Sequence, residues 1–168
     1  PLEQEDESIE IMLDQNLMAG FKLSPLVARR MIKQGKDSDR PCVGTIINLS
    51  SIAAQRTQSD LMGFSVSCAA LDQMTRCLAV SLAPDRVRVN AVAFGSVMSA
   101  SLQDHLREHP DHRDAILAAT PQGRIAGPTE VAEAVQFLAS DSSSFVTGEI
   151  LTVDGGRSLV DAVSTSLH

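Results

Sequence analysis

Aromatic residues are scarce in this sequence. Tryptophan and tyrosine are absent, and phenylalanine alone supplies the 3% of aromatic side chains. This scarcity argues against a platform for single-stranded nucleic acid, on which bases stack, and against a sugar-binding cleft. The hydrophobic core must therefore be built from Leu, Val, Ile, Ala and Met.

Cysteine is also scarce. The chain has three, Cys42, Cys68 and Cys77, with no C-x-x-C pair among them. An odd number of thiols without metal-ligand spacing indicates reduced cysteines in a cytoplasmic protein. No apolar run approaches the ~18 residues of a membrane helix, and the acidic stretch of residues 1–7 is the opposite of a signal peptide. We therefore expect no metal ligands and no membrane partner.

Positive charge is the third deficit, since the formal net charge is −7. A phosphate backbone would repel such a chain, so no nucleic-acid partner is expected. The densest basic cluster, Arg29, Arg30 and Lys33, is interpreted as the last turn of a helix, where cations complement the helix dipole. The composition is that of a globular protein, and the length fits one domain spanning residues 1–168.

The sequence alternates helical segments with apolar, strand-like ones. Residues 9–23 are apolar at helical spacing, Pro25 is a candidate kink, and Gly35 is placed to end this helix. Residues 43–49 form a short, β-branched, nearly continuous apolar run, which is typical of a strand buried on both faces. We expect helices at residues 8–33, 62–83 and 130–139, and strands at residues 43–49, 87–93 and 150–153.

This alternation predicts an α/β fold with a mostly parallel sheet. Three strands make a small sheet, and a strand as apolar as residues 43–49 requires a neighbour on each side. The sequence therefore implies that part of the sheet comes from another segment or from another chain.

Five segments carry a family resemblance when they are taken in order. Residues 44–51 read Gly-Thr-Ile-Ile-Asn-Leu-Ser-Ser, and residues 88–93 read Arg-Val-Asn-Ala-Val-Ala. The remaining matches are residues 14–17, residues 127–132 and the region 137–156, which ends in Asp-Gly-Gly. To about residue 159, the chain resembles the C-terminal part of a short-chain dehydrogenase/reductase.

The resemblance implies a Rossmann-like parallel sheet flanked by helices, with the N-terminal strands of the fold missing from this chain. It implies NAD or NADP at the C-terminal ends of the strands, and a catalytic set of Asn, Ser, Tyr and Lys. Asn16 and Ser51 match the first two members of that set. Phe64, thirteen residues after Ser51, occupies the Tyr position, and Cys68 occupies the Lys position.

These two replacements remove the family's means of proton transfer. Hydride transfer to a carbonyl needs a proton donor at the developing alkoxide, and a tyrosine serves when a nearby ammonium lowers its pKa from about 10. Phe64 has no hydroxyl, and Cys68 supplies no positive charge near neutral pH. General acid–base catalysis contributes ~10² to 10⁴-fold, so at least that factor is expected to be lost.

Four positions match residues that border the cofactor in the family: Phe94, Gly95, Val97 and Ser99. Phe94 stands where proline is usual, and its bulk would fill space beside the nicotinamide. The sequence contains no Gly-rich turn followed by a helix, so the pyrophosphate has no visible cradle. Whether this chain binds NAD or NADP by itself, or no nucleotide, is left open.

Each candidate also has a plainer interpretation, which we weigh more heavily. Ser51 would be a structural residue at a strand end. Asn16 would satisfy backbone groups inside a helix. Cys68 would be an inert, partly buried thiol, because no basic partner lies near it in sequence.

Three histidines, His105, His109 and His112, fall within residues 100–119, which resemble the family's variable substrate-covering loop. The spacing of the first two suits a metal on a helix face. We nevertheless expect loop or surface histidines and no metal.

The leading hypothesis is a degenerate family member that is non-catalytic alone and acts as a structural or regulatory subunit. By resemblance, it would form homo- or hetero-oligomers with short-chain dehydrogenase subunits through helices 8–33 and 62–83 and through strand 150–153. The alternative is an NAD(P)-dependent oxidoreductase acting on a carbonyl or alcohol, with its cofactor-binding half not in this sequence. A remnant with no stable fold of its own is a third possibility.

Overall fold

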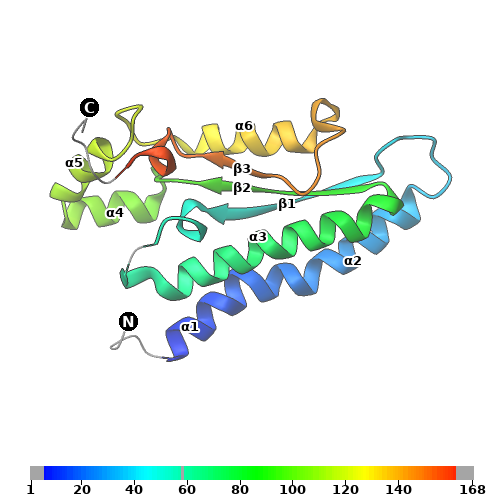
Figure 1. The fold of residues 1–168 in the computed structure, drawn as a ribbon, viewed down its shortest axis with the longest axis horizontal. Helices are drawn as coiled ribbons and strands as arrows, with labels where there is room; N and C mark the ends of the chain where they lie inside the picture. The colour runs from blue at the N-terminus through cyan, green and yellow to red at the C-terminus, as the bar shows by residue number, and fades with distance from the viewer. Residues whose placement is uncertain (1–5, 58, 162–168) are drawn as a thin grey trace.

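The computed structural model describes residues 6–57 and 59–161 as three layers, with a parallel sheet between helices (Figure 1). The α/β prediction is confirmed. One face of the sheet carries the N-terminal helices and α3, and the other carries α6. The helices are α1 (Asp6–Leu13), α2 (Ala19–Gln34), α3 (Met62–Leu82) and α6 (Pro128–Ala139), and the strands are β1 (Gly44–Ser51), β2 (Val87–Phe94) and β3 (Ile150–Val153).

The first helix is interrupted, but at a different place from the predicted kink. A π-helical turn, Asp14–Met18, separates α1 from α2. Pro25 lies inside α2, and the helix continues through it to Gln34. The N–H of Ala19 bonds to the carbonyl of Asp14, which is the wider i→i+5 closure of a π turn. Asn16 therefore sits on a local bulge of the helix.

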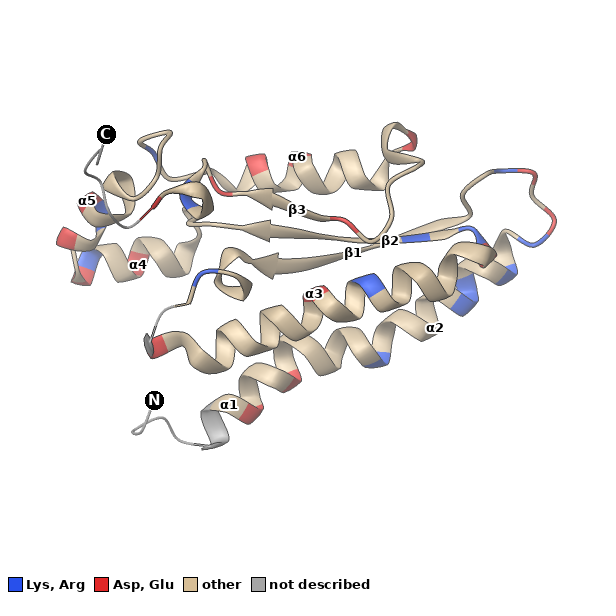
Figure 2. Cartoon of the chain, viewed as in Figure 1, with Lys and Arg blue, Asp and Glu red and all other residues tan. Residues whose placement is uncertain are grey.

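The C-terminal end of α2 agrees with the sequence. Gly35 caps the helix, and Lys33 lies in its last turn. Acidic side chains lie on α1, and basic ones lie toward the far end of α2 (Figure 2). None of the described helices combines the length and apolarity needed to cross a membrane.

Strand β2 is the centre of the sheet. It pairs in parallel with β1 from Gly44↔Val87 onward and with β3 from Ala91↔Ile150 onward. All of its residues but the last are buried. Within the described ranges, β1 pairs only with β2, and the Leu49 side chain near its end is 58% exposed. This open edge is where the sequence implied a further neighbour.

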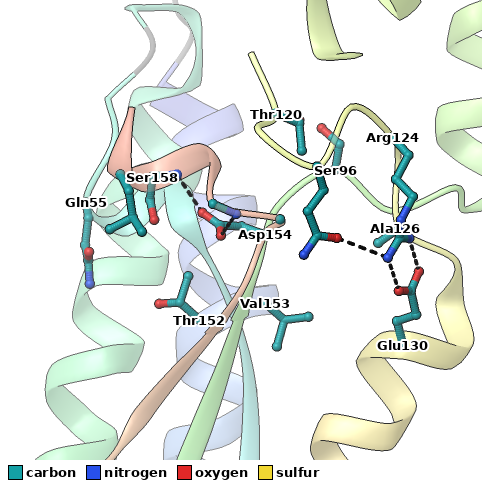
Figure 3. Close-up of a pocket in the computed structure, with 14 residues that line it drawn as sticks. Gln55, Ser96, Thr120, Arg124, Ala126, Glu130, Thr152, Val153, Asp154 and Ser158 are labelled. Atoms are coloured by element: carbon teal, nitrogen blue, oxygen red, sulfur yellow. Dashed lines mark hydrogen bonds and ion pairs between the residues drawn. The ribbon is translucent and has the colours of Figure 1, made fainter. Parts of the chain in front are cut away.

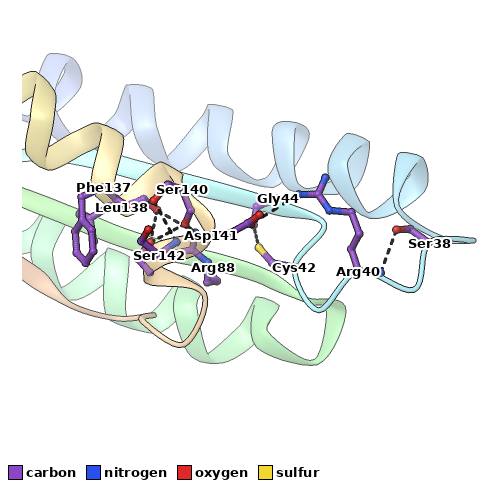
Figure 4. A network of polar contacts seen from close by, with 11 residues as sticks. Ser38, Arg40, Cys42, Gly44, Arg88, Phe137, Leu138, Ser140, Asp141 and Ser142 are labelled. Atoms are coloured by element: carbon purple, nitrogen blue, oxygen red, sulfur yellow. Dashed lines mark hydrogen bonds and ion pairs between the residues drawn. The ribbon is translucent and has the colours of Figure 1, made fainter.

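Two polar side chains of β2 are buried and hold the chain that leads into β3. The Arg88 guanidinium donates to the carbonyls of Leu138, Ser140 and Val146, at the C-terminal end of α6 and just beyond it (Figure 4). A cation at this end complements the helix dipole. The Asn90 amide donates to the Val146 carbonyl at 2.9 Å and accepts from the Glu149 N–H at 3.0 Å.

Residues 100–119 are not a loop, as the resemblance had suggested, but two helices. They are α4 (Ala100–Glu108) and α5 (Asp111–Ala118). The Ser99 hydroxyl accepts a hydrogen bond from the N–H of Leu102 at 3.2 Å. This is an N-cap that stabilises the start of α4. The strand arrows point toward the end of the molecule where α4 and α5 lie (Figure 1).

The N-terminal end of α6 is closed by a side chain from its own first turn. The Glu130 carboxylate accepts the Gly127 N–H at 2.8 Å and makes an ion pair with Arg124 at 2.7 Å. The hydrogen bond from Arg124, followed by that from the Gly127 backbone, lowers the pKa of Glu130 from 4.5 to about 2.

Asn90→Ala should destabilise the fold by roughly 2–4 kcal/mol, because it removes both hydrogen bonds of a fully buried side chain and leaves a cavity in its place. Urea unfolding of the two proteins measures the difference in the free energy of unfolding. Gln103→Ala, at an exposed position on α4, is the control and should change little. A loss below about 1 kcal/mol in Asn90→Ala would show that the 146–149 segment does not depend on this amide.

Glu130→Gln should lower the melting temperature near neutral pH, and the difference from wild type should shrink in acid. A pKa lowered in the folded state means that the stabilisation is present above the unfolded value of 4.5 and is lost as pH falls toward 2. Thermal melts between about pH 6 and pH 3 follow this. Glu133→Gln, an exposed carboxylate on the same helix, is the matched control. A difference that stays constant with pH would refute the assignment.

Candidate functional site

A cavity of about 660 Å³ lies at the C-terminal ends of β1 and β2. This is the edge of an open parallel sheet where ligands bind. Ser51 and Phe64, which the sequence paired by spacing, both line it. So do Gly95 and Ser96, which follow β2, while alanines of α5 and the segment after it form the opposite wall.

Ser51 ends β1, and its hydroxyl caps the short 3-10 turn that follows. The hydroxyl oxygen accepts a hydrogen bond from the N–H of Ala53 at 3.2 Å. A serine hydroxyl has one proton to donate and two lone pairs. Because the observed bond uses a lone pair, the Ser51 O–H can still donate to a ligand oxygen in the cavity. The structural role expected for Ser51 is therefore compatible with a role in binding.

Asn16 lies on the π turn and reaches across to α3. Its amide donates to the hydroxyl of Ser67 at 3.0 Å, and Ser67 donates in turn to the Phe64 carbonyl at 2.8 Å. The sequence interpretation placed its contact on the backbone of its own helix, whereas the observed partner is a side chain on the neighbouring helix. The bulge thus connects Asn16, through one hydroxyl, to the backbone of a cavity-lining residue.

Cys68 is buried, with 3% of its surface exposed, which agrees with the expectation of an enclosed thiol. Burial, reinforced by the charge of Asp72, raises the pKa of the Cys68 thiol, and contacts with Ser67 and the Ser51 backbone only partly offset this. The thiol is therefore less ionised than an ordinary cysteine. Asp72, whose charge contributes to this shift, has its carboxylate oxygen Oδ1 buried without a hydrogen-bond partner.

The four positions matched to the cofactor have local structural roles. Gly95 packs against Asp154 so closely that a Cβ would lie 3.0 Å from the Cβ of that residue. Val97 forms an isolated parallel bridge with Ala126, and Ser99 caps α4. Phe94 ends β2 and is half-buried. Of the four, only Gly95 lines the cavity, and nothing among these contacts tests a cofactor role.

His105, His109 and His112 meet on the surface where α4 ends and α5 begins. Their ring centroids are 4.9–5.0 Å apart, and Nε2 of His105 lies 2.8 Å from Nδ1 of His112. The expectation of surface histidines fits: His105 lies on α4, His112 lies on α5, and His109 caps the end of α4 between them. In the described ranges, no three His, Cys, Asp or Glu side chains converge as metal ligands.

A second cavity, of about 560 Å³, was not anticipated from the sequence. It lies beside the Asp-Gly-Gly turn after β3 and the start of α6 (Figure 3). Arg124 and Glu130 face each other there, and the Asp154 carboxylate accepts the N–H groups of Gly156 and Ser158. Arg124 and Glu130 are therefore engaged with each other, and Asp154 holds the turn.

Sequence reasoning also missed two arginines that line the first cavity, Arg56 and Arg157. Arg56 follows β1, and Arg157 follows β3. The side chain of Arg56 donates to the backbone of Ser158, which is 102 positions away in sequence. No local pattern connects residues so distant, so only the fold brings these cations together.

Cys68 should react with a thiol reagent such as DTNB far more slowly than Cys77, because it is buried and its raised pKa leaves little thiolate. Variants that retain one cysteine each, with the others changed to serine, allow the two rates to be measured separately. The rate at Cys68 should rise to that of Cys77 in denaturant. Equal rates in the native protein would contradict the enclosed position of the thiol.

A family described as enoyl-(acyl carrier protein) reductase matches residues 1–158. L-xylulose reductase from Caenorhabditis elegans is 38% identical over 152 residues, covering 90% of this chain and 58% of that protein.

Gluconate 5-dehydrogenase from Burkholderia cenocepacia, solved with NADP and tartrate, has a TM-score of 0.86 at 27% identity, covering 96% of this chain and 60% of that one. A tyrosine-to-phenylalanine variant of ElxO with NADPH bound has a TM-score of 0.83 at 26% identity, with 93% and 60% covered.

The chain spans about 60% of the length of the relatives it matches. Within that span, the order of helices and strands is conserved well enough for the whole sheet and both helical layers to superpose on solved members. The matching segments include the strand that ends in Ser51 and the helix that carries Phe64 and Cys68. By its sequence and by its fold, this chain belongs to the short-chain dehydrogenase/reductase family.

Proposed function

We propose that this chain forms the substrate-side part of an NAD(P)-dependent oxidoreductase that acts on a carbonyl or alcohol. The observation that carries the proposal is the cavity at the ends of β1 and β2, where Ser51, Phe64 and Gly95 meet under α5. The relatives that match are named as reductases and dehydrogenases. Because they extend well beyond the matched region, the phosphates of the cofactor would be held by residues outside this sequence.

The residues present fit only the nicotinamide end of such a cofactor. Gly95 and Ser96 border the cavity with backbone and a small hydroxyl, which leaves room for a flat ring. The sequence has no Gly-rich turn before a helix to receive a pyrophosphate. When bound, the nicotinamide would supply or accept the hydride. This chain would contribute the wall against which the substrate lies.

Ser51 is the side chain we propose to bind the reacting oxygen. Its hydroxyl is oriented by the bond from Ala53 and can donate to a carbonyl. Phe64, at the position of the family's tyrosine, supplies apolar surface and no proton. A water held by Ser51 would then deliver the proton, and we expect a rate that is ~10² to 10⁴-fold below that of a relative with a full acid–base pair.

We propose that the replacement at position 64 leaves nucleotide binding intact. The ElxO variant, which carries phenylalanine in place of a tyrosine, holds NADPH in its structure. A lost tyrosine hydroxyl therefore does not prevent a family member from binding its cofactor. This supports treating Phe64 as a change in the chemical step, separate from cofactor binding.

A non-catalytic structural or regulatory subunit is the second candidate, favoured by the replacements at Phe64 and Cys68. Large apolar side chains are exposed on α2 and α3. Phe21 is 60% exposed, and Leu26 and Val66 are also exposed. Large apolar side chains exposed on two neighbouring helices are what an interface would cover. We propose that these helices pair with a second short-chain dehydrogenase subunit, either a copy of this chain or an active relative.

Phe64→Tyr combined with Cys68→Lys should create no measurable NADPH-dependent ketone reduction in the 168-residue chain. The two side chains would restore the proton donor and its tuning cation, but no segment of this sequence holds the cofactor phosphates. Loss of nicotinamide absorbance is the measurement, with Ser51→Ala added to the double variant as the control. Turnover in the double variant that Ser51→Ala abolishes would show that this chain binds the cofactor by itself.

Native mass spectrometry of the protein from its own source separates the two candidates. Nucleotide bound to a longer chain that contains these residues is the result expected for the oxidoreductase. A complex in which only a different reductase chain carries nucleotide would support the regulatory subunit and overturn the first proposal.

A further inference from the structure

Two kinds of side chain line the first cavity. Ala115, Ala118, Ala119 and Phe64 give it apolar surface. Arg56 and Arg157, from the segments after β1 and after β3, bring two guanidinium groups to the same cavity. A neutral ketone or alcohol needs no cation, so these two groups point to a charged part of the ligand.

Both guanidinium groups are held in place by neutral acceptors. Arg157 donates through Nη1 to the hydroxyl of Ser96 at 2.7 Å. Arg56 donates through Nε to the Ser158 carbonyl at 2.7 Å, and through Nη2 to the same oxygen. A guanidinium has five N–H donors in a fixed fork. Each arginine is therefore positioned by a minority of its donors, without losing its charge to those partners.

Two carboxylates lie close to these arginines. Asp154 feels the charge of Arg157, and burial by itself would raise its pKa. Hydrogen bonds from Ser158 and Gly156, together with Arg157, outweigh that effect and leave the pKa of Asp154 lowered. Its oxygens accept the backbone N–H groups of the turn, and it does not line this cavity. Asp161 does line it, so its side chain belongs in any test of the charge balance.

We propose that this cavity takes a small hydroxy- or oxo-acid, with its carboxylate bound by Arg157 and Arg56 and its reacting carbon toward Ser51. A carboxylate matches the planar fork of a guanidinium and makes paired, charge-assisted hydrogen bonds with it. The inference rests on the proposed function, because it treats the cavity as the substrate site. It adds the class of substrate and the residues that select it.

The test compares tartrate with threitol, the neutral analogue in which each carboxylate is a hydroxymethyl group. Isothermal titration of the 168-residue chain, without nucleotide, measures both affinities. Tartrate should bind at least roughly ten-fold more tightly than threitol, as expected for charge-assisted hydrogen bonds. Equal affinities, or no tartrate binding, would overturn the proposal.

Arg157→Gln should weaken tartrate binding and leave threitol binding unchanged, and adding Arg56→Gln should reduce the tartrate affinity to that of threitol. Arg157→Lys should retain more of the preference than Arg157→Gln, because it keeps the charge but loses the fork. Asp161→Asn should strengthen tartrate binding by removing a like charge from the wall. Arg30→Gln, which removes an exposed cation on α2, is the matched control and should have no effect. A preference for tartrate that is undiminished in Arg157→Gln, or that survives in the double variant, would sink the assignment.

Failure of this inference can be told apart from failure of the proposed function. The protein from its own source could bind tartrate through Arg157 and yet never reduce or oxidise any substrate with NAD(P). That result would overturn the oxidoreductase and leave the acid site standing. Faster turnover of neutral ketones than of oxo-acids by that protein would overturn the acid site and leave the oxidoreductase standing.

Discussion

The burial of two polar side chains in β2 is the constraint on which this structure depends. A guanidinium and an amide in the middle of a buried strand are costly unless their hydrogen bonds are made. Asn90 and the two Nη groups of Arg88 make such bonds with the segment from the end of α6 to the start of β3, whereas Nε of Arg88 is buried without a partner. That segment is thereby fixed against the central strand, β3 enters the sheet in register, and the turn that follows β3 carries Arg157 to the cavity.

The candidate site then follows from the direction of the strands. All three are parallel, so Ser51, Gly95 and the Asp-Gly-Gly turn arrive at one edge of the sheet from separate parts of the chain. The helix that carries Phe64 packs beside the strand that ends in Ser51, and α5 closes the opposite side. In the proposed function, this arrangement would be the outline of a catalytic site, with Phe64 at the position of the family's tyrosine.

The parts of the fold that depend on local patterns could be predicted from the sequence. The strand predicted at residues 150–153 has the same limits in the structure, and a single glycine, Gly35, predicts the end of α2. The π turn at Asp14–Met18 could not be predicted, because one widened turn leaves no periodicity of its own. Helix α4 differs from the loop that the family resemblance implies, although Ser99 offers a capping signal for it. The arginine pair depends on contacts between distant segments, which no local pattern records.

The connection from α6 to β3 also has a kinetic consequence. Asn90 and Val146 are 56 positions apart, and Arg88 and Leu138 are 50 apart, so the polar bonds of β2 close long loops. Contacts of long sequence separation form slowly, because the entropy of loop closure must be overcome before any contact is gained. Strands β1 and β2, joined through α3, can associate earlier than β3. The docking of β3 and the segment before it onto β2 is therefore expected to be a late and slow step of folding.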